Sequence, residues 1–199
     1  MIQSLKDYKY YIERDKIALN AKPTSFLMRL KELLFPNKIL KFQLVLRKYE
    51  YLRNKNDKNV FDRFLLLLVY SRFRRISLQL GFSIPPNVFD SGLSIAHYGT
   101  IVVNHNSKVG INCRIHACVN IGASAGNKSA PQIGKNVYIG PGAKLFGDIK
   151  IADNVIIGAN AVVNKSCLEE NCVLAGNPAK VVKKLLPEEI KKYIRHIKV

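Results

Sequence analysis

The chain is poor in acidic residues. Of its 199 residues only 14 are Asp or Glu, against 32 Lys or Arg, and the formal net charge is +18. A surface of this sign attracts anionic partners, although net charge bears on solubility and nonspecific binding more than on fold. The charge would suit a nucleic-acid binder, but the sequence has no recognisable reading module, aromatic stacking platform or recognition helix. We therefore expect no nucleic-acid partner.

Long apolar runs are absent as well. The longest run, Phe64 to Tyr70, is far shorter than the roughly 20 residues that cross a bilayer. The first thirty residues mix acidic and basic side chains and lack the apolar stretch of a signal peptide. We expect a cytoplasmic protein. The helix that carries Arg72, Arg74 and Arg75 should pack in an oligomer interface or, as the less favoured alternative, rest on the inner face of an anionic membrane.

What the sequence does contain is a six-residue repeat. Aliphatic residues recur every six positions from residue 133 onward, and a small or aliphatic residue follows each of them four positions later. Neither a helix nor a strand has a period of six, so the pattern predicts the stacked hexapeptide rungs of a parallel β-helix. The frame extends back to Ile95 and slips by two residues between Ile101 and Val109. Its clearest members are Ile133, Ile139, Leu145, Ile151, Ile157 and Val163.

One polar stretch interrupts the repeat. Residues 123–132 read ASAGNKSAPQ, yet Ile121 and Ile133 are twelve positions apart, so the frame survives across them. We predict a loop pushed out of the coil, where repeat scaffolds often carry functional elements. Glycines should mark tight corners that leave little room for a side chain. These glycines are Gly110, Gly122, Gly134, Gly140 and Gly158.

The four cysteines form two pairs with four intervening residues each, Cys113 with Cys118 and Cys167 with Cys172. Cys113 and Cys167 fall on inward small-residue positions of rungs, and Cys118 lies beside another. We predict that they fill the core in a reducing compartment rather than bind zinc.

The chain divides into three parts. Helical patterns precede the repeat, over residues 5–19, 25–35, 38–53 and 60–80. Gly81 is placed to end the last of these helices, and a short basic helix is predicted over 187–199. We predict an α+β fold with a helical region over 1–82, a β-helix domain over 83–182 and a basic C-terminal segment over 183–199.

Five segments resemble the serine acetyltransferase branch of the hexapeptide-repeat acyltransferases: AHYGTIVVN, VNIGASAG, IGPGAKLFGDI, IGANAVV and AGNPAKVV. The match runs from about Ile84 to Val182, and AGNPAK, which is similar to the family's AG-x-PA-[KR] signature, is its most specific part. The resemblance implies a left-handed β-helix, a homotrimer, and acetyl-CoA in the groove between neighbouring coils. The helical front end is shorter than the family's, which leaves open any assembly beyond the trimer.

The resemblance also implies a histidine as general base, and His97 occupies the matching position. A thioester is already an activated acyl donor, so one base near neutrality suffices. His116 is the second candidate, because the rung spacing stacks it over Ala96 and close to His97. We regard His105 and His196 as incidental.

By the same resemblance, small residues should line the acetyl-CoA groove and Lys180 should meet a CoA phosphate. We expect no metal requirement. The predicted groove residues are Gly122, Gly140, Pro141, Ala159, Gly176 and Lys180.

Four positions depart from the family. Its aspartate before the catalytic histidine is Ala96 here, and its upstream aspartate falls on Phe82. Its arginine and histidine after the glycine-rich loop fall on Ser129 and Ala130. In the family these groups orient the base and hold the amino acid's carboxylate and ammonium. Since an unpaired carboxylate in a closed site is costly, we predict a saccharide acceptor, anionic or phosphate-linked, in a surface polysaccharide such as capsule or lipopolysaccharide, or in its precursor.

Two alternatives stay open. Serine O-acetylation, as in cysteine biosynthesis, would require His97 to work without its aspartate partner. A metal-dependent enzyme similar to the gamma carbonic anhydrases would need three histidines converging on zinc, and the four histidines here lack those motifs.

Overall fold

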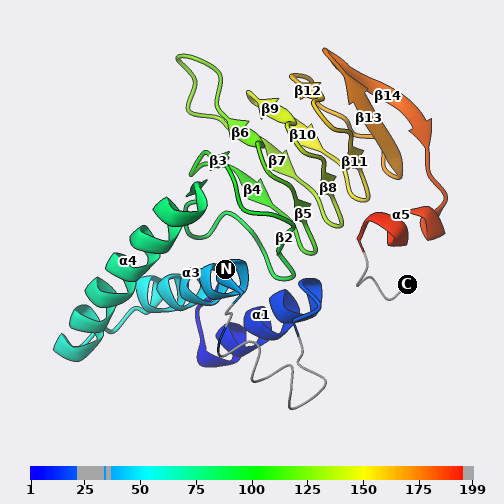
Figure 1. Cartoon of the computed structure of the whole chain (residues 1–199). Helices are drawn as coiled ribbons and strands as arrows, with labels where there is room; N and C mark the ends of the chain where they lie inside the picture. Colours follow the sequence, from blue (N-terminus) through cyan, green and yellow to red (C-terminus); the bar gives the residue numbers. More distant parts are fainter. Residues whose placement is uncertain (22–33, 35–36, 195–199) are drawn as a thin grey trace.

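The computed structural model describes residues 1–21, 34 and 37–194. Helices α1 (Leu5–Ala18), α3 (Lys38–Asn54) and α4 (Val60–Leu80) lie at one end of the stack of β-strands, and α5 (Pro187–Tyr193) lies toward the other end (Figure 1). The helix predicted over 25–35 lies outside the described residues except for Leu34, and so does the end of the predicted helix over 187–199.

The strands form three sheets that wind as a coil. Their orders are β1-β3-β6-β9-β12, β10-β7-β4 and β14-β13-β11-β8-β5-β2, and every pair is parallel except β13 with β14. The predicted α+β fold, with a left-handed parallel β-helix between N-terminal helices and a short C-terminal helix, is confirmed. The strands are β1 (Phe82–Ser83), β2 (Ser94–Ile95), β3 (Ile101–Val103), β4 (Lys108–Val109), β5 (Arg114–Ile115), β6 (Asn120–Gly122), β7 (Gln132–Ile133), β8 (Tyr138–Ile139), β9 (Lys144–Phe146), β10 (Lys150–Ile151), β11 (Ile156–Ile157), β12 (Val162–Val163), β13 (Cys172–Gly176) and β14 (Ala179–Lys184).

The strand register reproduces the repeat. Ile139 pairs with Ile157, eighteen positions later, so one coil is three hexapeptides. Ile95 pairs with Ile115, twenty positions later, which confirms the slip of two residues in that coil. The coil that holds residues 123–131 is six residues longer than the standard coil, and this segment loops out between β6 and β7 (Figure 1).

Asparagines make several of the left-handed corners. Asn112, Asn136 and Asn154 have φ of 59°, 54° and 61°, a region that Asn tolerates better than other non-glycine residues. Their side chains form a ladder, because Asn112 Nδ2 donates to Asn136 Oδ1 and Asn136 Nδ2 to Asn154 Oδ1, each at 2.9 Å. Gly110 lies at a corner with little room for a side chain, as predicted: a Cβ there would lie 2.8 Å from the backbone of Gly134.

A buried charged cluster fixes the helices to the first coil. Arg47 on α3 is fully buried; its Nε lies 2.8 Å from Asp15 on α1, and its Nη1 lies 2.9 Å from Glu50. The guanidinium also donates to the carbonyl oxygens of Phe89 and Asp90, at 2.8 Å each. Burial alone would lower the pKa of Arg47, but the two carboxylates raise it above its usual value. The guanidinium is therefore charged and tied to three segments of the chain.

The same cluster reaches the chain just before β2. Asp15 Oδ1 accepts hydrogen bonds from the amides of Gly92 and Leu93, at 2.8 and 2.9 Å. Gln43 Nε2 on α3 donates to the carbonyl oxygen of Leu93 at 2.7 Å. These bonds fix the segment that leads into β2 and on to His97.

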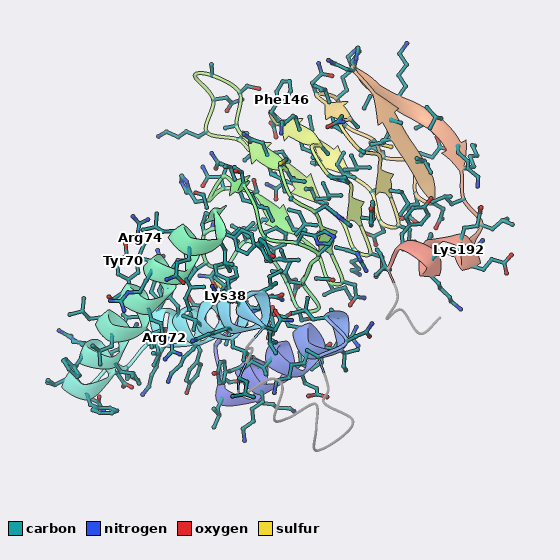
Figure 2. The ribbon with its side chains drawn as sticks, in the orientation of Figure 1. Lys38, Tyr70, Arg72, Arg74, Phe146 and Lys192 are labelled. Atoms are coloured by element: carbon teal, nitrogen blue, oxygen red, sulfur yellow. The ribbon has the colours of Figure 1, made fainter. Side chains whose placement is uncertain are left out.

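Helix α4 carries much of the uncovered apolar surface. It ends at Gly81, with φ of 75°, as the sequence predicted. Several of its large apolar side chains are exposed, and Tyr70, Arg72 and Arg74 lie at the opposite side of the molecule from Lys192 on α5 (Figure 2). Within the described residues, no helix is both long and apolar enough to cross a bilayer.

Candidate active site

The two candidate histidines meet at one corner of the coil. His97 follows β2 and His116 follows β5, and these strands are neighbours in the six-stranded sheet. The ring centroids lie 5.8 Å apart with the planes tilted by 54°. His97 is exposed, whereas His116 is half-buried. The structure thus brings the two predicted histidines together on consecutive coils. His116 is level with Ala96, so His97 lies one position further along its coil.

The two rings have different surroundings. Burial, and then the positive charges of Arg114 and His97, lower the pKa of His116 to about 4. His116 is therefore neutral near pH 7, and its buried Nε2 bonds to nothing in the described part of the chain. The exposed His97 makes no side-chain hydrogen bond to any described residue, and Asp90 instead accepts a bond from the amide of Ser91 at 2.6 Å.

Four of the predicted groove residues lie along the same corner. Gly140 and Pro141 follow β8, Ala159 lies two positions after β11, and Gly176 ends β13. Because these strands are stacked in register, the residues after them form a column that continues toward His116. A Cβ on Gly140 would lie 2.8 Å from the amide nitrogen of Ala159, so this corner needs a glycine for packing alone.

Lys180 is adjacent to this column, whereas Gly122 is not. Lys180 pairs with Ala175 across the hairpin of β13 and β14. It is exposed, and its ammonium forms no ion pair with any described residue, whereas Lys183 and Lys184 pair with Glu189 and Glu169. Gly122 ends β6 in the five-stranded sheet. The predicted groove residues therefore belong to two different sheets of the β-helix.

Helix α5 covers the sheet beside His116. Tyr193 packs edge-on against Tyr138, with centroids 5.3 Å apart, and Tyr138 lies 5.0 Å from the ring of His116. Ile190 packs with Ile156 in a small apolar cluster under the helix. Sequence reasoning missed this contact, because a short basic helix at the end of a chain is typical of a solvated tail.

The four departures from the family fall in different places. Phe82 is a core residue that packs edge-on against Phe42, with centroids 5.0 Å apart, so its position cannot supply a polar group. Ser129 is half-buried and Ala130 is buried, both in the chain before β7. Ala96 lines a cavity of about 190 Å³ beside Arg114, a residue that the sequence analysis had not singled out.

The cysteines play no part in this site. Cys113, Cys167 and Cys172 are buried, as core fillers would be, but Cys118 is exposed at a turn with φ of 63°. The sulfur atoms of Cys167 and Cys172 are 3.7 Å apart and not bonded to each other. Among the described residues, no group of three or more His, Cys, Asp or Glu side chains is placed to hold a metal ion.

Comparison with known proteins adds to this geometry. A family model described as bacterial transferase hexapeptide (six repeats) matches residues 130–165. A serine acetyltransferase from Mycobacterium tuberculosis is 36% identical over 121 residues, which are 59% of this chain and 52% of that protein. The chain spans about half the length of the curated relatives that it matches.

Solved structures agree. A serine acetyltransferase from Brucella abortus superposes with a TM-score of 0.69 at 25% identity, over 90% of this chain and 70% of that one. The Neisseria gonorrhoeae serine acetyltransferase gives a TM-score of 0.69 at 25% identity, over 98% and 74%. The chain is similar to the serine acetyltransferases in sequence and in fold. The predicted resemblance to the serine acetyltransferase-like branch of the hexapeptide-repeat acyltransferases is confirmed.

The similarity to serine acetyltransferases corrects the predicted acceptor. The predicted acceptor, a saccharide of a surface polysaccharide, is wrong. The similar proteins and structures are serine acetyltransferases, which favours the alternative of serine O-acetylation. The prediction assumed that nothing replaces the family's cations near the base. Arg114 lies on the sheet face beside His116 and was overlooked, because a basic residue at an outward rung position is usually solvated.

Proposed function

We propose that the chain is an acetyl-CoA-dependent O-acetyltransferase whose acceptor is the hydroxyl of L-serine. The observation that carries this proposal is the pair of His97 and His116 at the corner of the coil, in a chain similar to serine acetyltransferases. A general base at this corner lies beside a column of small residues, over which an extended pantetheine arm has room to pass.

His97 is the base in this mechanism. Its imidazole takes the proton of the serine hydroxyl as that oxygen attacks the thioester carbonyl carbon of acetyl-CoA. The tetrahedral intermediate then collapses, the carbon–sulfur bond breaks, and the imidazolium returns the proton to the departing CoA thiolate. The products are O-acetylserine and CoA. No metal enters these steps, since the thioester is already activated.

His116 has a different role. A base whose pKa is about 4 is too weak to take a proton from a hydroxyl near neutrality. As a neutral ring, 5.8 Å from His97 between centroids, it adds no positive charge of its own beside the working imidazolium. We propose that His116 helps to position the groups around His97 and does not itself transfer the proton.

The donor side rests on the small-residue column. Gly140, Pro141, Ala159 and Gly176 would border the pantetheine arm, and Lys180 would meet a phosphate of CoA as a point charge. Gly122, which ends β6 in another sheet, would reach the same acetyl-CoA only if it belonged to a neighbouring subunit. That requirement supports a homotrimer, with grooves between subunits.

The decisive experiment is a thiol-release assay. Purified protein is incubated with acetyl-CoA and L-serine, and free CoA is measured against samples that contain glycine instead of serine. Glycine keeps the ammonium and carboxylate but lacks the hydroxyl. Release that requires serine, with O-acetylserine identified as product, supports the proposal. Tight acetyl-CoA binding without serine-dependent release would refute serine as acceptor.

A further inference from the structure

Arg114 is a cation that lines a cavity near the site, and it forms no ion pair with any described residue. It lies on β5 opposite Ser94 of β2 and Tyr138 of β8, while the next residue, Ile115, points into the core. Its Nε is shut off from solvent and bonds to nothing among the described residues. A buried N–H group of a charged side chain is costly without an acceptor. The two Nη atoms are neither buried without a partner nor hydrogen-bonded to a described residue, so they are the groups that a ligand can reach.

A small cavity lies beside this guanidinium. Its volume is about 190 Å³. It is lined by residues at the end of α1 and the start of α3, together with Ser94, Ala96 and Arg114. Ligand pockets for drug-sized molecules are typically about 300 to 1,000 Å³, so this one suits only a small molecule. Asn20 and Ser94 add polar side chains to its wall.

The cavity lies next to the base in the sequence, although neither histidine ring lines it. Ala96, which lines it, directly precedes His97. Arg114 is also close enough to His116 for its charge to disfavour a proton on that ring. An acceptor with an anionic group on Arg114 could therefore present its hydroxyl toward His97 at the edge of the same cavity.

We propose that Arg114 binds the carboxylate of the acceptor in this cavity and so selects a small hydroxy acid. The proposal rests on the function proposed above and names the residue that holds its substrate. The guanidinium offers the N–H groups of its two Nη atoms to the two carboxylate oxygens, a paired geometry that lysine cannot copy.

The test compares two acceptors in two proteins. L-serinamide keeps the hydroxyl and ammonium of L-serine but replaces the carboxylate with a neutral amide. Arg114→Gln should raise the KM for L-serine about 10- to 100-fold, the loss of a charge-assisted pair, and change that for L-serinamide less than about twofold. Arg114→Lys should restore part of the loss. The KM for acetyl-CoA should stay the same in each variant.

Arg72→Gln is the matched control, because Arg72 is an exposed arginine on α4 and lines no part of this cavity. It should leave both KM values unchanged. Equal changes for L-serine and L-serinamide in Arg114→Gln would overturn the carboxylate role, since a merely structural arginine would affect both acceptors alike.

Calorimetric titration with L-serine separates this proposal from the proposed function. If the wild type binds serine without transferring acetyl, and Arg114→Gln binds at least about tenfold more weakly, the carboxylate site stands and the serine transferase activity fails. If the wild type neither binds nor acetylates serine, both fail. If the wild type acetylates serine and Arg114→Gln binds it equally well, only the carboxylate site fails.

Discussion

His97 and His116 show how neighbouring rings of one type acquire different chemistry. His97 is exposed at the corner, and His116 is kept neutral by burial, Arg114 and His97. We predict that His97→Ala lowers kcat about 10²- to 10⁴-fold, as expected for loss of a general base, while acetyl-CoA still binds. Steady-state kinetics and a CoA titration measure the two effects. His105→Ala, at another exposed histidine, is the control. A loss smaller than about tenfold would remove His97 as the base.

The neutral His116 makes stability depend on pH. The pKa of its ring is lowered from 6.5 to about 4, so the unfolded chain takes up a proton as the pH falls before the folded chain does. The stability from the neutral ring is therefore fully present above about pH 6.5 and is lost as the pH falls to 4. After discounting for solvent screening we expect about 1 kcal/mol. Urea unfolding at pH 7 and pH 5 should show a smaller difference in His116→Gln than in wild type. Equal pH dependence would contradict it.

Lys180 gives a prediction for the donor. Its exposed ammonium has no ion pair in the described chain and is adjacent to the small-residue column. Lys180→Ala should raise the KM for acetyl-CoA about 1.5- to 5-fold, the range for an exposed charge pair, with little change in kcat. Lys165→Ala, at an exposed lysine beyond β12, serves for comparison. An unchanged KM would place Lys180 outside the donor site.

At the scale of elements, the helices depend on the buried cluster around Arg47. Arg47→Met would leave Asp15 and Glu50 buried without their cation, and breaking a buried pair this way costs about 3 to 5 kcal/mol. We expect the free energy of unfolding to fall by about that amount in a denaturant titration. Arg53→Met, at an exposed arginine of the same helix, should change it by less than about 0.5 kcal/mol. A small loss for both would mean that the cluster relaxes.

The elements also show what a sequence can and cannot predict. The period of six fixes the coil, the slip after Ile101 and the loop before β7, because each follows from the spacing of inward aliphatic residues. The asparagine ladder was missed, since its residues meet only after the chain has completed a turn. Arg47 was missed for a related reason: its partners on α1 and before β2 are distant in sequence, so it reads as one more surface cation.

The site follows the same pattern. The proximity of His97 and His116 could be predicted because motif and rung spacing are both local. The proposed acceptor could not be predicted, because the sequence shows that the family's cations are missing at Ser129 and Ala130 but does not show which other cation lies near the histidines. Arg114 becomes visible only when β2, β5 and the ends of α1 and α3 enclose one cavity.

At the scale of the whole molecule, a single chain leaves much apolar surface uncovered. On α4, Phe61, Phe64 and Leu67 are 70%, 59% and 63% exposed, and Phe146 on β9 is 38% exposed. Apolar surface of this kind marks association sites. We expect light scattering after gel filtration to give three times the mass of the chain across a tenfold dilution. A mass equal to one chain throughout would contradict the proposed trimer.

A stack of parallel rungs has no natural length, because each end offers unpaired backbone groups to the next rung or to another molecule. Here the first rung lies against α3 and α4, and the last is closed by β14, which runs antiparallel and carries Lys180, Lys183 and Lys184. Charged side chains on an edge strand discourage further strand pairing. Strand β14 therefore ends the stack of strands. We would expect a chain truncated at Leu174, which lacks β14, to assemble into fibres.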